Sequence, residues 1–423
     1  ARDAAGRGLK VLLAEQGDLA SGTSSCSSKL VHGGLRYLEY FDFRLVKESL
    51  QERDVLLRSM PHICWPLRFV MPYDRELRYD SSSPLSRLSS VFMPWAGGKR
   101  PRWMLGLGLA MYDQMAGSRQ LPGHRRLDLR SDAAGGPLQE RFASAFEYSD
   151  CWVDDARLVV LCARDAQARG AAIRTRTKVV GARRAKGHWE IELDAGGAKE
   201  KVQAKALVNA TGAWVNATQE EIGQENRHAS NLRLVRGSHL VFKKLYEHDR
   251  CYILAGPDGR IVFIIPYEND YTLVGTTEVD QQQPEAEPCS DAETDYLLDF
   301  VSKYLRVQPA KKDLVWSYAG VRPLFGSGDD AAAAVTRDYS IKVATADGLP
   351  LANVYGGKIT TFRRLAEEVM RRLQPHFPAL GPARPGPAPP ACPAATSPST
   401  ATSGRSSGWA PSTPTSTPPS PAG

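Results

Sequence analysis

Apolar residues recur at regular intervals along most of the chain, and the interval predicts the elements. Between Phe43 and Ser59 they return every three or four residues, which is typical of an amphipathic helix, and Pro61 ends the pattern. A second helix is predicted within Phe146–Asp165, and a strand, a Gly-Gly turn and a helix within Val354–Leu365. Short apolar or alternating runs predict strands at Leu9–Glu15, Pro66–Tyr73, Ala172–Arg176, Lys178–Leu193, Ala206–Gly212, Leu234–Phe242, Ile261–Tyr267, Thr272–Gly275 and Ser317–Leu324.

The stretch Ser21–Glu39 has a different composition, because small residues, hydroxyls and glycines dominate it. Small residues let the backbone approach a ligand closely, and hydroxyls with backbone N–H groups can surround anionic oxygens. The strand before it ends in Glu15, where a dinucleotide-binding βαβ unit places the acidic residue that hydrogen-bonds the ribose hydroxyls. The pattern indicates a nucleotide-cofactor loop. A surface Ser/Gly loop after an ordinary strand fits the composition equally well.

Length and composition narrow the class of protein. The chain has 423 residues, 42% of them hydrophobic and 24% charged, enough for two domains with cores of their own. Its seven cysteines show no CxxC pair, so no disulfide framework and no metal site is predicted, and a reducing compartment is favoured. The net charge of +7 allows attraction to anionic small molecules or lipids, but we find no nucleic-acid-binding module.

The segment Val91–Met115 combines an apolar run with Trp95, Trp103 and three basic residues. Aromatic and cationic side chains beside an apolar helix suit contact with lipid headgroups. A core helix preceded by a basic loop explains the same pattern. Neither this segment nor any other has the roughly 18 consecutive apolar residues of a membrane-spanning helix.

Longer motifs carry a family resemblance. The segment DLASGTSSCSSKLVHGGLRYLEYFDFRLVKESLQERDVLL resembles the flavin-proximal segment of the FAD-dependent, aerobic respiratory glycerol-3-phosphate dehydrogenases. The stretches FEYSDCWVDDARLVV, LVNATGAWV, RGSHLV, VGTTEVD, YAGVRPL, VTRDYS and YGGKITTFRRLAE resemble the same family in the same order. The likeness extends over about Ala1–Leu380.

The resemblance implies a mixed α/β (α+β) fold, with a Rossmann-like FAD-binding domain interleaved with a mixed-sheet substrate domain. We expect the FAD-binding domain in 1–65, 146–215 and 316–380, and the substrate or cap domain in 66–145 and 216–315. The last segment, 381–423, holds 12 of the 29 prolines and almost no charge. We expect no core there, and interpret it as a frameshifted or artefactual tail or as a genuine disordered linker.

The resemblance also implies an activity. FAD would take a hydride from C2 of sn-glycerol 3-phosphate to give dihydroxyacetone phosphate, and ubiquinone would reoxidise the flavin at the membrane. The location implied is cytoplasmic, peripheral on the inner face of the cell membrane, and a homodimer is left open. A glycerophosphate oxidase that uses oxygen is the near alternative.

Residue chemistry selects candidates within these motifs. Guanidinium groups match a phosphate dianion, so Arg36, Arg322 and Arg337, with Tyr37, are expected to bind the substrate. His239 is the candidate base that also contacts substrate, because imidazole titrates near working pH; a solvent-exposed strand histidine is the alternative. Catalytic roles are expected for His239, Arg322 and Lys358, the lysine stabilising the reduced flavin.

The cofactor residues that the resemblance implies follow the Ser21–Glu39 loop and two later turns. Glu15 would hold the ribose, hydroxyls and Lys29 would line the phosphates and ring, His32 would orient or polarise the ring, and glycines would let it approach the backbone. The full set is Glu15, Ser21, Thr23, Ser24, Ser25, Ser28, Lys29, His32, Gly33, Gly34, Gly212, Gly357, Lys358 and Thr360.

The first residues, ARDAAGRG, look like the latter part of a helix, and no GxGxxG turn precedes them in this sequence. In the family that turn binds the FAD pyrophosphate. Poor FAD retention is therefore expected, and a non-catalytic fragment is the competing interpretation.

Overall fold

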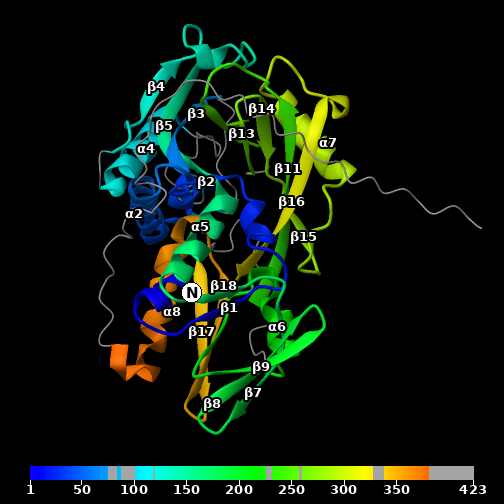
Figure 1. The fold of residues 1–423 in the computed structure, drawn as a ribbon. Coiled ribbons are helices and arrows are strands. Elements are labelled where there is room, and N and C mark those ends of the chain that lie inside the picture. Colours follow the sequence, from blue (N-terminus) through cyan, green and yellow to red (C-terminus); the bar gives the residue numbers. More distant parts are fainter. Residues whose placement is uncertain are drawn as a thin grey trace, which may run out of the picture.

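The computed structural model describes residues 1–74, 83–86, 101–117, 120–224, 231–256, 260–326 and 338–380. Within them, ten strands form a large mixed sheet whose main path runs β15–β11–β14–β13–β12–β3–β5–β2, with β16 beside β11 and β4 beside β5 (Figure 1). The strands are β2 (Leu30–Val31), β3 (Cys64–Pro72), β4 (Arg125–Asp128), β5 (Ser144–Val153), β11 (Leu232–Lys243), β12 (Cys251–Ala255), β13 (Ile261–Tyr267), β14 (Tyr271–Gly275), β15 (Val279–Gln281) and β16 (Leu314–Phe325).

Helices cover both faces of this sheet, and the alternation of strand residues decides what each face meets. Leu240 and Phe242 of β11 pack in a core that includes helix α7 (Asp291–Ser302). Val241, between them, belongs to the opposite core, with helices α2 (Phe43–Ser59) and α4 (Arg102–Ala116).

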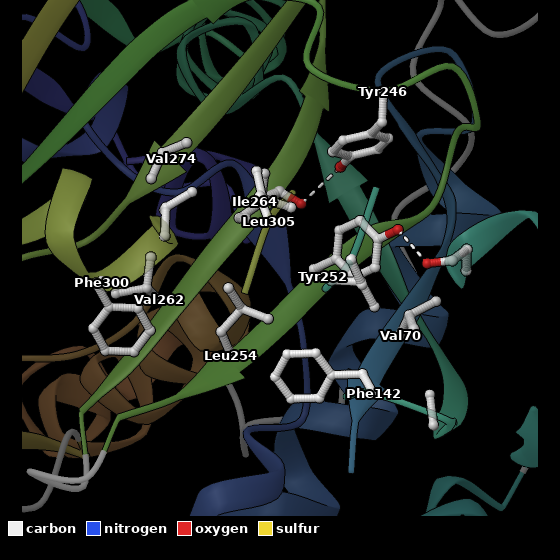
Figure 2. Packing of buried hydrophobic residues seen from close by; sticks show 14 of the residues in the cluster. Val70, Phe142, Tyr246, Tyr252, Leu254, Val262, Ile264, Val274, Phe300 and Leu305 are labelled. Atoms are coloured by element: carbon white, nitrogen blue, oxygen red, sulfur yellow. Dashed lines mark hydrogen bonds between the residues drawn. The ribbon is translucent and has the colours of Figure 1, made fainter. Parts of the chain in front are cut away.

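The core on the α7 side is rich in aromatic and β-branched side chains (Figure 2). Its tyrosine hydroxyls are satisfied: Tyr246 donates to the carbonyl of Ile264 at 2.9 Å, and Tyr252 to that of Ala134 at 2.6 Å. Buried polar groups that are paired avoid the desolvation penalty, so these hydrogen bonds do not destabilise the core. The core in turn supports the strands whose other face carries the candidate site.

Three smaller sheets complete the described fold, in the lower half of Figure 1. Two contain parallel pairs, which need crossover connections and are typical of nucleotide-binding α/β units. The parallel pairs are β1 (Leu12–Ala14) with β6 (Ala172–Arg174), and β10 (Leu207–Asn209) with β18 (Leu349–Gly356), whose other neighbour is β17 (Tyr339–Ala346). The third sheet is antiparallel and contains β7 (Lys178–Ala185), β8 (His188–Ala195) and β9 (Ala198–Ala204).

The remaining helices flank these sheets: α1 (Arg2–Gly6), α5 (Asp155–Ala168), α6 (Val215–Glu221) and α8 (Phe362–Leu373). The α/β class, with parallel pairs beside a large mixed sheet, is confirmed. Among the described helices, none combines the length and apolarity needed to cross a membrane.

Several predicted elements have the predicted bounds. The helix Phe43–Ser59 and the strand Ile261–Tyr267 are confirmed at both ends. The strands predicted at Leu9–Glu15 and Ala206–Gly212 are shorter, because only Leu12–Ala14 and Leu207–Asn209 make ladder contacts. The helix within Phe146–Asp165 is α5, but β5 occupies the first part of that range.

The division into domains stays a prediction. Strand β16 pairs antiparallel with β11, and β5 pairs antiparallel with β3, so the large sheet includes strands from segments that we assigned to the cofactor domain. Segment 381–423 lies outside the described residues, as do Trp95 and the basic residues before Pro101.

Candidate active site

The loop that follows β1 packs against strand β16. Thr23 Oγ1 donates to the carbonyl of Val321 at 2.6 Å, and the Tyr318 hydroxyl donates to the carbonyl of Ser27 at 2.8 Å. Between these two bonds the strand has Gly320, where a Cβ atom would lie 2.7 Å from the Cβ of Cys26. The loop and the strand therefore meet at backbone distance, and the loop residues predicted to bind a cofactor lie beside the large sheet.

His239 of β11 lies at this junction and is 1% exposed. Its Nε2 is 2.8 Å from Ser28 Oγ, and its ring stacks on Tyr318 with centroids 4.8 Å apart. The ring also covers Gly275, where an added Cβ would lie 2.2 Å from Cδ2. Nδ1, the other ring nitrogen, is buried and has no hydrogen-bond partner within the described chain. The structure contradicts the alternative interpretation of a solvent-exposed histidine.

The surroundings keep His239 neutral. Burial lowers the pKa of its imidazole to about 3, and the positive charges of Arg322 and Lys29 act in the same direction. At neutral pH the ring therefore has one nitrogen lone pair available to accept a proton. With Nε2 hydrogen-bonded to Ser28, Nδ1 is the ring nitrogen left without a partner in the described part of the chain.

Arg322 of β16 lies next to this histidine. Its Nη2 donates to Thr276 Oγ1 at 2.8 Å, and Nη1 is 3.8 Å from a carboxylate oxygen of Glu278. The guanidinium group covers Gly237, where an added Cβ would lie 2.3 Å from Nη2. Gly237 and His239 are two residues apart on β11, so Arg322 and the imidazole occupy the same face of the sheet.

A second cluster contains Gly34, Tyr37 and Lys358. Gly34 has φ +76°, and a Cβ there would lie 2.2 Å from the Tyr37 ring. The ammonium group of Lys358 lies 3.9 Å from the centroid of the same ring, at the start of the turn that leads into α8. The structure thus brings together one predicted substrate residue and two predicted cofactor residues, and a cation over an aromatic face is a favourable pair.

Lys29 forms contacts within the protein. Its ammonium group is 2.7 Å from Asp155, whose side chain is fully buried, and 3.2 Å from the carbonyl of Ser25. Asp155 also accepts from the hydroxyl of Ser27 at 2.7 Å. This ion pair fixes the loop to the start of α5, which accounts for Lys29 without a ligand.

The other predicted residues that the structure describes have contacts of their own, away from His239. Ser21 and Ser24 are exposed, and Ser21 Oγ donates to the carbonyl of Asp18 at 2.8 Å. Half-buried Arg36 lies beside Tyr37, and His32 meets Phe263 edge-on at 6.2 Å. Ser25 Oγ donates to the carbonyl of Gly22 at 3.4 Å, Thr360 is buried, and Arg337 lies outside the described residues.

A charged depression of about 470 Å³ is lined by none of these residues. It lies where α2 and α8 face each other, and its arginines are paired: Arg44 with Asp338 and Glu48, and Arg371 with Glu368 at 2.6 Å. Because these arginines already have carboxylate partners, they contribute little free positive charge for binding a phosphate.

The sequence itself matches a known family model over residues 1–363, that of the FAD dependent oxidoreductases. The chain belongs to the FAD-dependent oxidoreductase family. Two relatives are each 46% identical to it: D-erythritol 1-phosphate dehydrogenase of Brucella abortus over 384 residues and glycerol-3-phosphate dehydrogenase of Pseudomonas aeruginosa over 393. These alignments cover 90% and 92% of the chain and 72% of each relative.

The fold of this FAD-dependent oxidoreductase is also similar to a solved structure. Glycerol-3-phosphate dehydrogenase from Bacillus halodurans, complexed with FAD, superposes with a TM-score of 0.62 at 23% sequence identity. The match covers 90% of this chain and 63% of that chain. The predicted family and the predicted cofactor are confirmed.

The donor set of this oxidoreductase fits FAD. Glu15 follows β1 directly, and Gly212 follows β10 with φ +62° and no atom within 4 Å of an added Cβ. Gly357 has φ +100°, a conformation that side chains rarely adopt. All three residues follow strands of the two sheets that contain parallel pairs, where nucleotide-binding folds place their ligand, and Gly212 has open space beside its Cα. Together with the unpartnered Nδ1 of His239, they suit a group with hydroxyls, phosphates and a flat ring.

Five residues that contact the predicted site residues were missed by the sequence analysis. They are Asp155 beside Lys29, Thr276 beside Arg322, Tyr318 beside His239, and Tyr112, which accepts from the Gly33 N–H at 2.8 Å, with its partner Asp150. Thr276 and Tyr318 lie inside motifs that carried the family resemblance, VGTTEVD and YAGVRPL, so the signal was present but no role was assigned. Asp150 and Asp155 lie within the motif FEYSDCWVDD, which also carried the resemblance, but the sequence analysis assigned them no role. Tyr112 had no local signal, because its contacts come from distant segments.

Proposed function

We propose that this chain oxidises glycerol 3-phosphate at C2 to dihydroxyacetone phosphate. The observation that carries the proposal is the buried, neutral His239, whose Nδ1 has no partner in the described chain, on the same sheet face as the guanidinium group of Arg322. A neutral base next to a phosphate-binding cation is what dehydrogenation of a phosphorylated secondary alcohol requires. When bound, FAD supplies the acceptor for the hydride that leaves C2.

The protein's own residues handle the proton and the phosphate. In the tautomer whose Nε2–H donates to Ser28 Oγ, Nδ1 of His239 has the lone pair that accepts the hydroxyl proton. Arg322, oriented by its bond to Thr276, binds the phosphate. Since the charge of Arg322 lowers the pKa of His239, a bound dianion offsets that charge and makes the imidazole more basic when substrate is present.

A second substrate deserves direct comparison, because one 46%-identical relative is a D-erythritol 1-phosphate dehydrogenase. Both substrates have a phosphate and a neighbouring secondary alcohol, so Arg322 and His239 serve either one. They differ in the length of the carbon chain beyond the reacting alcohol. The ratio of kcat/KM for the two substrates therefore measures how well the protein accommodates the longer carbon chain.

Ubiquinone is the proposed electron acceptor, at a membrane surface contacted by α4. Trp103, Leu107 and Met111 are 63%, 60% and 37% exposed, and their spacing of four places them on one side of this helix. Such a stripe with a tryptophan suits the headgroup level of a lipid layer. The implied peripheral location and a homodimer belong to the same proposal.

The deciding experiment is anaerobic mixing. The chain, supplied with FAD and freed of excess, is mixed with glycerol 3-phosphate or D-erythritol 1-phosphate while the flavin absorbance is followed. Bleaching with glycerol 3-phosphate at the higher rate is expected. Faster bleaching with the erythritol phosphate would assign the second substrate, and no bleaching with either, in protein that dithionite still reduces, would contradict the proposal. The reduced protein is then mixed either with a soluble quinone or with air. Rapid reoxidation by the quinone indicates a dehydrogenase, and peroxide formation in air indicates an oxidase.

A further inference from the structure

Gly33, in the middle of the candidate active-site loop, is required for packing against the protein interior. An added Cβ would lie 2.6 Å from the Tyr112 hydroxyl and 2.7 Å from two carbons of Leu50. Tyr112 is on α4 and Leu50 on α2. The side of Gly33 where a side chain would stand therefore faces α2 and α4. We expected the missing side chain to let a flavin approach, whereas here it lets the two helices approach.

The contact with Tyr112 is a directed hydrogen-bond chain. The Gly33 N–H donates to the Tyr112 hydroxyl oxygen at 2.8 Å, and that hydroxyl donates to Asp150 at 2.7 Å. Arg53 in turn donates to the second oxygen of Asp150 at 2.9 Å and to the Ser149 carbonyl at 3.1 Å. A hydroxyl that donates to a carboxylate becomes a stronger acceptor, so the chain strengthens the bond to Gly33.

All three side chains are buried, with Tyr112 and Asp150 1% exposed and Arg53 3% exposed. Burial raises the pKa of Asp150 to about 6, while Arg53 and the Tyr112 hydrogen bond favour its charged form. Removing one member leaves a buried polar group without its partner, so the geometry is strongly constrained. Helices α2 and α4 and strand β5 each contribute one residue to this arrangement.

The loop residues that follow Gly33 form the second cluster of the site. Gly34, with its positive φ, leads directly into Tyr37, whose ring lies under Lys358. A shift of the Gly33 backbone would therefore move the Tyr37 ring and the lysine above it. The series of hydrogen bonds from Arg53 through Asp150 and Tyr112 to Gly33 therefore connects α2 and α4 to this cluster.

We propose that Tyr112 is a positioning residue of the active site: oriented by Asp150 and Arg53, its hydroxyl fixes the Gly33 backbone and so places Tyr37 and Lys358. This inference rests on the proposed function only in treating the Tyr37–Lys358 cluster as part of the active site. On this proposal the buried side of α4 holds the loop through Tyr112, and the exposed side of the same helix carries Trp103, Leu107 and Met111.

The test compares two tyrosine-to-phenylalanine variants of the full chain. Tyr112→Phe removes the hydroxyl that meets Gly33. The matched control, Tyr148→Phe, removes a hydroxyl from a tyrosine that is 3% exposed and packs edge-on against Tyr112 at 5.8 Å. Hydrogen exchange without FAD, followed by mass spectrometry, is read at the peptide containing Gly33 and at one within α5.

In Tyr112→Phe, exchange at the Gly33 peptide is expected to accelerate about tenfold, with the α5 peptide unchanged, and FAD to bind about tenfold more weakly by fluorescence quenching. Tyr148→Phe leaves both unchanged. Unchanged exchange at Gly33, or equal acceleration in both variants, would overturn the proposal. If Tyr112→Phe does not fold, Asp150→Asn gives the decision, because the neutral amide weakens the same chain and must accelerate the same peptide. Absence of turnover with glycerol 3-phosphate would count against the proposed function and leave the exchange result intact.

Discussion

At the scale of single residues, the site depends on strict alternation along β11. Ser238 points to the α7 side, where its hydroxyl donates to buried Glu293 at 2.7 Å. His239 points to the other side, toward Ser28 and Tyr318. A shift of one residue in the pairing of β11 would exchange the two, burying the histidine among the α7 contacts. The ladder of β11 with β16 therefore determines which of the two residues faces the candidate active site.

The lowered pKa of His239 predicts a specific dependence of stability on pH. The unfolded imidazole takes up a proton near pH 6.5, whereas the folded one does so near pH 3, so between these values acid favours the unfolded state. His239→Asn removes this linkage. From pH 7 to pH 5 the parent chain is expected to lose about 2 kcal/mol of unfolding free energy relative to the variant.

Urea unfolding at several pH values measures this difference, since other titrating groups contribute equally to both proteins. Between pH 7.5 and 8.5 the difference between the two proteins should stay constant, which serves as the internal control. Parallel stability profiles from pH 7 to 5 would mean that the folded histidine titrates normally.

Arg322 predicts a kinetic effect at the same scale. Arg322→Ala removes a charge-assisted contact worth about 1.5–3 kcal/mol, so kcat/KM for glycerol 3-phosphate is expected to fall by about one to two orders of magnitude. Arg233→Ala is the matched control, because Arg233 is paired with Asp280 at 2.6 Å in the same sheet. Steady-state kinetics that leave Arg322→Ala within threefold of the control would remove Arg322 from the substrate site.

At the scale of elements, a glycine inside α4 and a glycine directly after it have opposite expected effects. Gly108 lies inside the helix with open space around an added Cβ, so Gly108→Ala is expected to stabilise the protein by about 0.5–1 kcal/mol. Gly117, just after the helix, has φ +71°, and Gly117→Ala is expected to destabilise by about 1 kcal/mol. Urea midpoints of the two variants should move in opposite directions. If neither midpoint moved, α4 would not unfold together with the rest of the protein.

Elements with a strong local pattern could be predicted from the sequence, and elements defined by distant partners could not. The helix Phe43–Ser59 and the strand Ile261–Tyr267 have their predicted ends because the apolar spacing is continuous. β16 was predicted as a strand, but its pairing with β11 depends on residues about 80 positions away in the chain. Local pattern does not encode such a register.

The same distinction holds for the site. His239 and Arg322 were predicted through their motifs, and the structure places both on one face of the β11–β16 ladder. The ion pair of Lys29 with Asp155 joins residues 126 positions apart, and Tyr112 reaches Gly33 across 79 positions. A sequence shows that a lysine or tyrosine is present, but folding decides whether it meets a ligand or another part of the chain.

At the scale of the whole molecule, a buried ion pair joins the first and last described parts of the chain. Glu52 of α2 is fully buried and accepts from Arg363 of α8 at 2.8 and 2.5 Å, and from Arg364 at 3.1 Å. Arg363 and Glu52 are 311 positions apart. This contact connects α8, which follows the Lys358 turn, to α2, which follows the Tyr37 segment. It therefore holds together the two segments that carry the Tyr37–Lys358 cluster.

Arg363→Met tests this connection. Methionine replaces the packing volume but leaves the Glu52 carboxylate buried with only the weaker contact to Arg364, and an uncompensated buried charge costs about 3–5 kcal/mol. A loss of about 3 kcal/mol in unfolding free energy is expected, with weaker FAD binding because Lys358 loses its support. Arg371→Ala, in the exposed pair with Glu368 on the same helix, should leave the midpoint unchanged. If both variants unfold at the parent's urea concentration, the α2–α8 ion pair does not hold the two segments together, and the placement of Lys358 must depend on the β18 ladder instead.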